Sequence, residues 1–101
     1  MDLDALVGWS ERNRERLNAA EIAVTLSETS PRDKPSRTLS LSSPRLEADV
    51  MVWITGECDV VIGHVASGDT DVVHHEFASD DELFAALEAI CDRFGADAQA
   101  S

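Results

Sequence analysis

Met51-Val-Trp-Ile-Thr-Gly-Glu-Cys-Asp-Val-Val-Ile62 is the stretch of sequence that decides the fold. Its two halves are rich in β-branched and apolar residues, and the Gly56-Glu57 step between them is typical of a tight turn. We therefore expect a β-hairpin at the centre of a sheet. Because both halves are apolar at successive positions, each face of the hairpin needs cover from the rest of the chain or from a partner.

The register of this hairpin remains open between two arrangements. A two-residue Gly56-Glu57 loop suits a type II′ turn, pairs Thr55 with Cys58 and places Trp53 on the Cys58 face. A three-residue loop instead places Ile54 with Cys58 and turns Trp53 to the opposite face. We favour the two-residue loop because glycine comes first in it. In both registers the second face keeps apolar side chains, and it becomes a candidate interface if both helices cover the first face.

Alternating apolar and polar residues predict further strands on both sides of the hairpin. A polar segment with two prolines, 28–36, is expected to be a loop, Pro44 marks the next break, and Ser67-Gly68-Asp69 marks a turn. Short connections favour antiparallel neighbours. We expect five strands, at about 22–27, 38–42, 46–55, 58–65 and 71–77.

Apolar residues at spacings of three and four predict a helix at each end of the chain. In the first helix we expect Asp2 or Asp4 as the cap and Trp9 near the edge of the buried stripe, which consists of Leu3, Leu6, Val7 and Leu17. Ser79 and Glu82 have the spacing of a capping box, and Gly95 is expected to end the second helix. The prediction is one α+β domain over 1–95, a five-stranded mainly antiparallel meander with flanking helices, and a disordered tail over 96–101.

The charge balance is strongly acidic. Among 101 residues, 20 are acidic and 8 are basic, which gives a net charge of −12. This charge argues against nucleic acid and anionic membranes as partners and favours a basic protein surface, although acidity can also serve solubility alone. No stretch is long and apolar enough to span a bilayer, and Met1-Asp-Leu-Asp4 lacks the features of a signal peptide. We therefore expect a cytoplasmic protein in which Cys58 and Cys91 are reduced core residues.

The histidines are the residues most able to support chemistry. His74 and His75 are adjacent in an expected strand, so they point to opposite faces and cannot share one metal ion, although either can meet His64 across paired strands. The chain has no helical zinc motif, no nucleophile elbow and no glycine-rich phosphate loop. We expect no enzyme activity, no catalytic or metal site and no cofactor.

The order of several residues resembles the TriTu family of immunity proteins. The resemblance is carried by Trp53, by Gly56-Glu57-Cys58, by Gly68, by His75 and by the Leu83–Phe94 helix, and the N-terminal helix with Trp9 fits the same layout. It implies a protein that neutralises a cognate toxin through a stoichiometric interface. It supplies no binding residues that can be transferred to this sequence.

The partner-binding residues are therefore predicted from charge and position. We expect the interface to include Asp69, Asp71, His74, Glu76, Trp53 and Glu57, and the toxin to present a basic surface. The chain is expected to be a monomer or a homodimer. The alternative function is a small acidic secretion-type chaperone, or a protein-binding module that acts as a homodimer.

Overall fold

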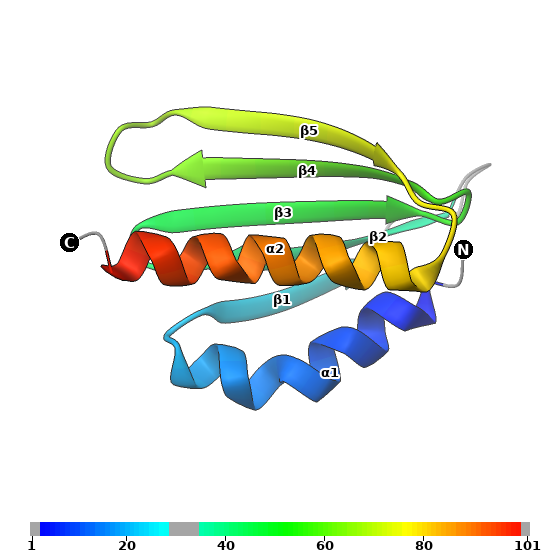
Figure 1. The fold of residues 1–101 in the computed structure, drawn as a ribbon, viewed down its shortest axis with the longest axis horizontal. Helices are drawn as coiled ribbons and strands as arrows, with labels where there is room; N and C mark the ends of the chain where they lie inside the picture. The colour runs from blue at the N-terminus through cyan, green and yellow to red at the C-terminus, as the bar shows by residue number, and fades with distance from the viewer. Residues whose placement is uncertain (1–2, 29–34, 100–101) are drawn as a thin grey trace.

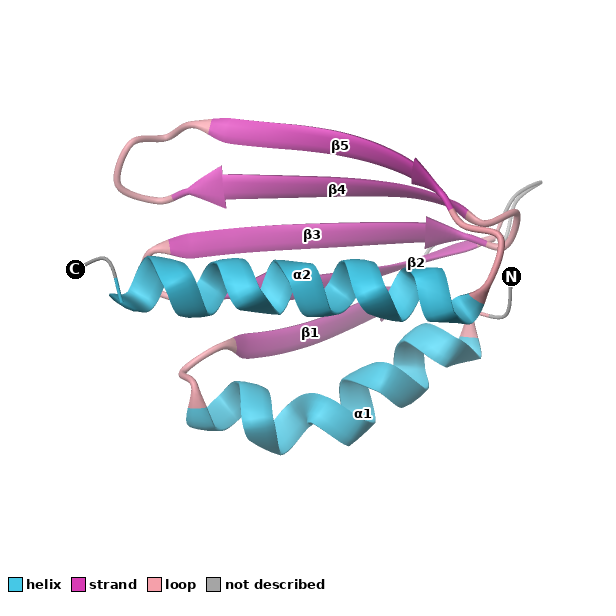
Figure 2. Ribbon diagram, viewed as in Figure 1, coloured by secondary structure: helices cyan, strands magenta, loops and turns pink. Residues whose placement is uncertain are grey.

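The computed structural model describes residues 3–28 and 35–99. Helix α1 (Asp4–Ala19) is followed by β1 (Ala23–Glu28), β2 (Ser36–Ser42), β3 (Leu46–Trp53), β4 (Glu57–His64), β5 (Thr70–Glu76) and helix α2 (Asp80–Gln99). The five strands form one antiparallel sheet in the order β1-β2-β3-β4-β5 (Figures 1 and 2). The predicted fold class, an N-terminal helix, a five-stranded meander sheet and a C-terminal helix in chain order, is confirmed.

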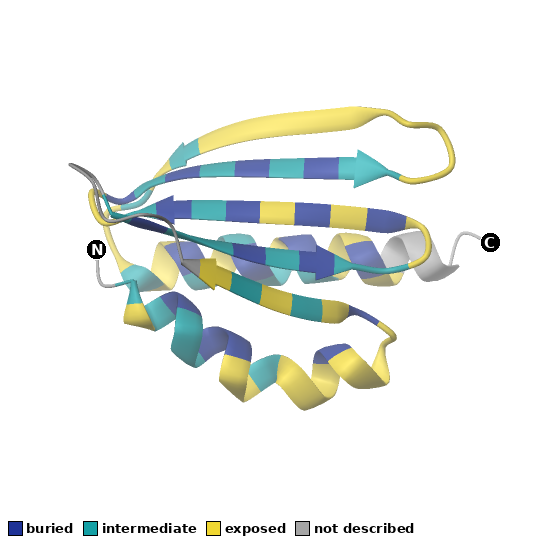
Figure 3. Cartoon of the chain, turned by 180° about the vertical axis from the view of Figure 1, so that it is seen from behind, coloured by how far each residue is buried: buried dark blue, intermediate teal, exposed yellow. Residues whose placement is uncertain are grey.

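Both helices cover the same face of the sheet. Along β3, Leu46, Ala48, Val50 and Val52 are buried, and the residues between them are exposed or half-buried (Figure 3). We call the covered side of the sheet the inner face and the opposite side the outer face. One core joins the inner face to the helices, and its buried apolar residues are Leu6, Trp9, Leu17, Ile22, Leu39, Leu41, Leu46, Ala48, Val50, Val52, Cys58, Val60, Ile62, Leu83, Leu87, Ile90 and Phe94.

Helix α1 differs from the prediction at its start and along its buried stripe. Its N-cap residue is Leu3, which makes no side-chain capping bond, and Asp4 lies in the first turn. The expected Asp4 cap is therefore wrong, and Asp2 lies outside the described residues. Trp9 is 3% exposed and belongs to the core, not to its edge, because a position three residues after Leu6 lies on the same helix face.

Helix α2 begins as predicted and ends later. The Glu82 N–H donates to Ser79 Oγ at 3.3 Å, which is the first bond of the expected capping box. The Glu82 carboxylate accepts from the Ala78 N–H at 3.0 Å, one residue before the cap. The helix does not end at Gly95, because Gly95 lacks the positive φ of a helix-ending glycine. Residues 96–99 of the expected tail are helical, and residues 100–101 lie outside the described part of the chain.

The β3–β4 hairpin does not adopt the register of the favoured two-residue loop, and each side chain of β3 lies on the face opposite to the one that loop predicts relative to β4. Val52 pairs with Cys58, so the loop is Ile54-Thr55-Gly56 and Trp53 lies on the outer face. The two-residue loop is wrong, and the three-residue arrangement is correct about Trp53, although Ile54 lies in the loop itself. The reason is Gly56, whose φ of 96° closes a three-residue hairpin loop and whose N–H donates to the Trp53 carbonyl at 2.9 Å.

Candidate functional site

The outer face of β3, β4 and β5 combines carboxylates with apolar side chains. Side chains alternate along each strand, so every second residue of these strands points away from the helices. The carboxylates on this face are Glu47, Asp49, Glu57, Asp59 and Glu76, and the large apolar residues are Met51, Trp53, Val61 and Val72. Among the strand residues that the structure describes, none that faces outward is a lysine or an arginine.

Strand pairing arranges this acidic face in rows across the sheet. Met51, Asp59 and His74 form one row, and Asp49, Val61 and Val72 form the next. Glu57 pairs with Glu76, and Trp53 follows the Val52–Cys58 pair at the end of β3. Trp53, Met51 and Val61 are half-buried, whereas Val72 is 66% exposed. The face therefore intersperses apolar side chains with carboxylates.

His74 and Asp59 form a close polar contact on this face. His74 Nδ1 lies 2.6 Å from Asp59 Oδ1. The Asp59 carboxylate raises the pKa of His74, mainly through this hydrogen bond, with smaller contributions from its charge and from Glu76 and Glu57. The raised pKa favours the imidazolium form, which places a positive charge among the carboxylates.

The six predicted partner-binding residues divide between three places. Trp53, Glu57, His74 and Glu76 all lie on the outer face. Asp69 lies in the β4–β5 turn, where its carbonyl accepts from the His64 N–H at 2.8 Å and its N–H donates to Ser67 Oγ at 3.3 Å. Asp71 is on the inner face, because its partner Ile62 belongs to the core.

Asp71 takes part in a separate ion-pair group at the margin of the inner face. Its carboxylate lies 3.5 Å from His64 Nε2 and 3.8 Å from Arg93 Nη2 of helix α2. These contacts link β5 to β4 and to α2. Asp71 and His74 are an odd number of residues apart in one strand, so they cannot contribute to the same face.

The histidines are dispersed, as the strand geometry requires. His74 is on the outer face opposite Asp59, whereas His75 is on the inner face opposite Cys58, where it stacks on Phe77 with ring centroids 5.3 Å apart. The contact that strand pairing permitted between His64 and another histidine does not form, because His64 lies at the far end of β4 beside Asp69. Over residues 3–28 and 35–99, no group of three histidine, cysteine or carboxylate side chains is arranged to hold a metal ion.

Both cysteines are free, and of the two expected core residues only Cys58 belongs to the core, with Cys91 packed against it. Cys58 is buried, and burial, with the neighbouring Asp59 charge, raises the pKa of its thiol to about 12. Cys91 is half-buried, and burial also raises its pKa. Neither thiol has the lowered pKa that activates a nucleophile.

The prediction missed part of the acidic face. Glu47, Asp49 and Asp59 share it with the predicted residues, and Met51, Val61 and Val72 are apolar residues on the same face. These residues could have been found by counting every second position along β3, β4 and β5 from Trp53 and His74. That count places them on one face only once the hairpin register is known.

No helix in the described ranges is long and apolar enough to cross a membrane. The comparisons with curated proteins and with solved structures found no match. The family model described as "Immunity protein TriTu" matches residues 4–93, which include every strand, helix α1 and most of helix α2. The chain therefore belongs to the TriTu family of immunity proteins.

Proposed function

We propose that this immunity protein neutralises a cognate toxin domain by binding it directly, with the outer face of β3–β5 as the contact surface and a basic surface on the toxin. The observation that carries this proposal is the composition of the face, on which carboxylates are interspersed with Trp53, Met51 and Val61. Protein interfaces combine apolar contacts with polar and charged groups in this way. The protein acts by occupancy, without catalysis, in the cytoplasm of a bacterial cell.

Charge supports a basic partner surface. The net charge is −12, and the outward-facing residues of the described strands include carboxylates but no lysine or arginine. Such a field attracts a positively charged protein and accelerates its association. Trp53, at the centre of the hairpin end, is the residue type that most often anchors an interface. His74, Glu57 and Glu76 complete the predicted contact, and Asp69 and Asp71 extend the negative field beyond it.

Charge reversal on the acidic face tests the proposal. In the double variant Glu47→Lys and Glu76→Lys, both substituted side chains are exposed, so the fold should remain intact. We expect the association rate constant with the co-expressed toxin domain to fall by roughly tenfold at low salt, with a smaller change in the dissociation rate. Stopped-flow or surface plasmon resonance measurements over a range of salt concentrations give both rates.

A matched control makes the same charge change elsewhere. Glu11 and Glu15 are exposed on α1, so Glu11→Lys with Glu15→Lys alters the net charge equally and leaves the outer face unchanged. The proposed surface requires a markedly smaller effect in this control. Equal effects of the two double variants would show that only net charge matters and would remove the outer face from the proposal.

Trp53→Ala tests the apolar part of the proposed surface separately. Trp53 is half-buried on the outer face and is not part of the core cluster. We therefore expect this substitution to accelerate dissociation of the complex more than it lowers the stability of the free protein. Unchanged dissociation would exclude Trp53 from the interface.

A further inference from the structure

Strand β5 is a free sheet edge. It is the last strand in the order, and no further strand lies beyond it in the parts of the chain that the structure describes. All of its residues except His75 are exposed, and Val72 and Val73 are 66% and 48% exposed (Figure 3). Strand β1, at the other edge, runs beside helix α1 (Figure 1). A seven-residue edge strand without proline or lysine is a template for pairing with another strand.

The hydrogen bonds that bound β5 determine which of its residues face the open edge. The His64 N–H donates to the Asp69 carbonyl and the Phe77 N–H donates to the Gly56 carbonyl, each at 2.8 Å. Because bonded pairs alternate along an antiparallel ladder, Asp71, Val73 and His75 direct their backbone groups toward β4. The backbone groups of Thr70, Val72, His74 and Glu76 therefore point outward.

The β5 sequence can pair with a second copy of itself when Thr70, Val72, His74 and Glu76 supply the backbone hydrogen bonds. An added antiparallel copy must pair even-numbered residues with even-numbered ones, and the register centred on Val73 satisfies this requirement. It places Val73 opposite the second copy of Val73, Asp71 opposite His75, and Val72 opposite His74. A carboxylate then meets an imidazole on the inner side, and an apolar pair lies on the two-fold axis.

The space beside β5 suits the same arrangement. A groove of about 250 Å³ runs between β5 and α2, with Ile62, Val73 and Ala89 in its lining. In the register above, the second Val73 approaches the rim of this groove. The outer face remains uncovered, because edge pairing extends a sheet without stacking on it.

We propose that β5 is a self-association edge, at which two copies of this chain join their sheets through antiparallel β5–β5 pairing centred on Val73. The interface is one strand wide, so the dimer is expected to be weak and to depend on protein concentration. Because each copy carries a net charge of −12, added salt should strengthen it. This inference does not depend on the toxin interface, since it uses the backbone edge of β5, whereas the proposed toxin surface uses outward side chains, including Val72, His74 and Glu76 of the same strand.

Sedimentation equilibrium of the whole chain, without any toxin, tests the proposal. We expect a monomer–dimer equilibrium whose association constant rises with salt. Val73→Lys places two positive charges against each other on the axis and should lower the association constant at least roughly tenfold. The control is Ile54→Lys, which makes the same change in net charge at a residue of similar exposure, 46%, in the β3–β4 loop, and which should not lower the constant.

Disulfide trapping tests the register. Paired copies of residue 73 would be about 4.5 Å apart at Cα, within the reach of a disulfide. Copies of residue 72 would be staggered by two residues and out of reach. We expect Val73→Cys to form a covalent dimer under mild oxidation faster than Val72→Cys, although exposure alone predicts the reverse order, since Val72 is the more exposed residue. The parent chain with its native cysteines is the control.

Three results would overturn the proposal. The first is a wild-type protein that stays monomeric up to about 1 mM, which is the weak end of specific association. The second is a dimer that Val73→Lys and Ile54→Lys affect equally. The third is cross-linking that follows exposure, with Val72→Cys ahead of Val73→Cys. None of these results bears on toxin binding, so the two proposals can fail separately.

Discussion

At the scale of single residues, Gly56 is the position with the least tolerance for a side chain. Its φ of 96° lies in the region that L-residues avoid, and a Cβ there would lie 2.5 Å from the Phe77 carbonyl oxygen. That oxygen belongs to the backbone, so it cannot move without disturbing the start of the connection to α2. We expect Gly56→Ala to lower the free energy of unfolding by at least about 3 kcal/mol, measured by urea denaturation.

Gly68→Ala is the matched control for this substitution. Gly68 also has a positive φ, 78°, but a Cβ there would meet no atom within 4 Å. Its cost should be that of the backbone conformation alone, about 1 to 2 kcal/mol. If the two variants are equally destabilised, the contact with Phe77 has no energetic weight.

The errors in predicting single residues have one cause, which is that odd and even positions of a strand point to opposite faces of the sheet. Trp53 changes face when the hairpin loop changes from two residues to three, and the glycine was compatible with both loops. Asp71 and Glu76 were grouped by their charge, although five positions separate them in one strand and place them on opposite faces. The sequence shows which side chains are acidic. Which of them share a face follows only from the pairing register of the strands.

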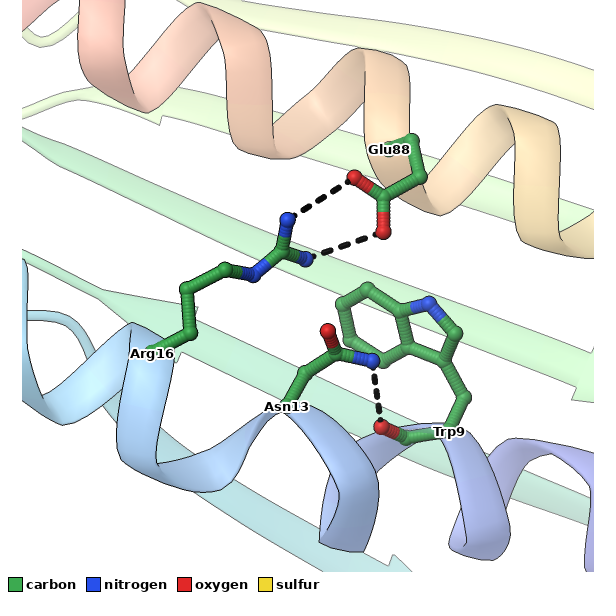
Figure 4. A network of polar contacts seen from close by, with 4 residues as sticks. All are labelled: Trp9, Asn13, Arg16 and Glu88. Carbon is green, nitrogen blue, oxygen red and sulfur yellow. Dashed lines mark hydrogen bonds and ion pairs between the residues drawn. The ribbon is translucent and has the colours of Figure 1, made fainter.

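At the scale of elements, two arginines of α1 connect it to α2. Arg16 Nη1 and Nη2 donate to the Glu88 carboxylate at 3.1 and 2.9 Å (Figure 4), and Arg12 lies over the Phe84 ring at 5.6 Å. In Figure 4 the Arg16–Glu88 pair is drawn beside Trp9, whose carbonyl accepts from the Asn13 side chain at 2.8 Å. The hydrogen bonds with Arg16 lower the pKa of Glu88.

A double-mutant cycle with Arg16→Gln and Glu88→Gln measures this link. Both side chains are about half exposed, so solvent screening limits the coupling energy to about 0.5 to 1 kcal/mol despite the two parallel bonds. Because the pKa of Glu88 in the folded state is lowered from 4.5, the stabilisation is present above that value and is lost as pH falls through the lowered pKa. A coupling energy that is the same at pH 7 and below pH 3 would contradict the ion pair.

Element order was readable because each signal was local. Strand alternation, turn residues and the capping box at Ser79 and Glu82 predicted the five strands and the start of α2. The end of α2 was missed because a glycine permits a helix to end without requiring it, and Gly95 keeps a helical backbone. The packing of both helices on one face of the sheet depends on contacts between distant parts of the chain. The sequence therefore does not decide whether the helices share a face.

At the scale of the whole molecule, self-repulsion opposes folding. The net charge of −12 is confined to a body whose longest extent is 42 Å. At about 0.01 M salt the Debye length is about 30 Å, so most charges in the folded protein repel one another, whereas at about 1 M it is about 3 Å. The unfolded chain spreads the same charges farther apart, and low salt therefore favours it.

We expect sodium chloride to stabilise the fold, with a rise in the free energy of unfolding of roughly 1 kcal/mol or more between about 0.01 M and about 1 M. Urea denaturation at low protein concentration measures this change without a contribution from β5 pairing. The same titration near pH 4.3, the isoelectric point, is the control, because the net charge is then close to zero and the effect should largely disappear. The Arg16–Glu88 pair weakens with salt in both series, so a stability that falls with salt at pH 7 would mean that such local pairs outweigh the net repulsion.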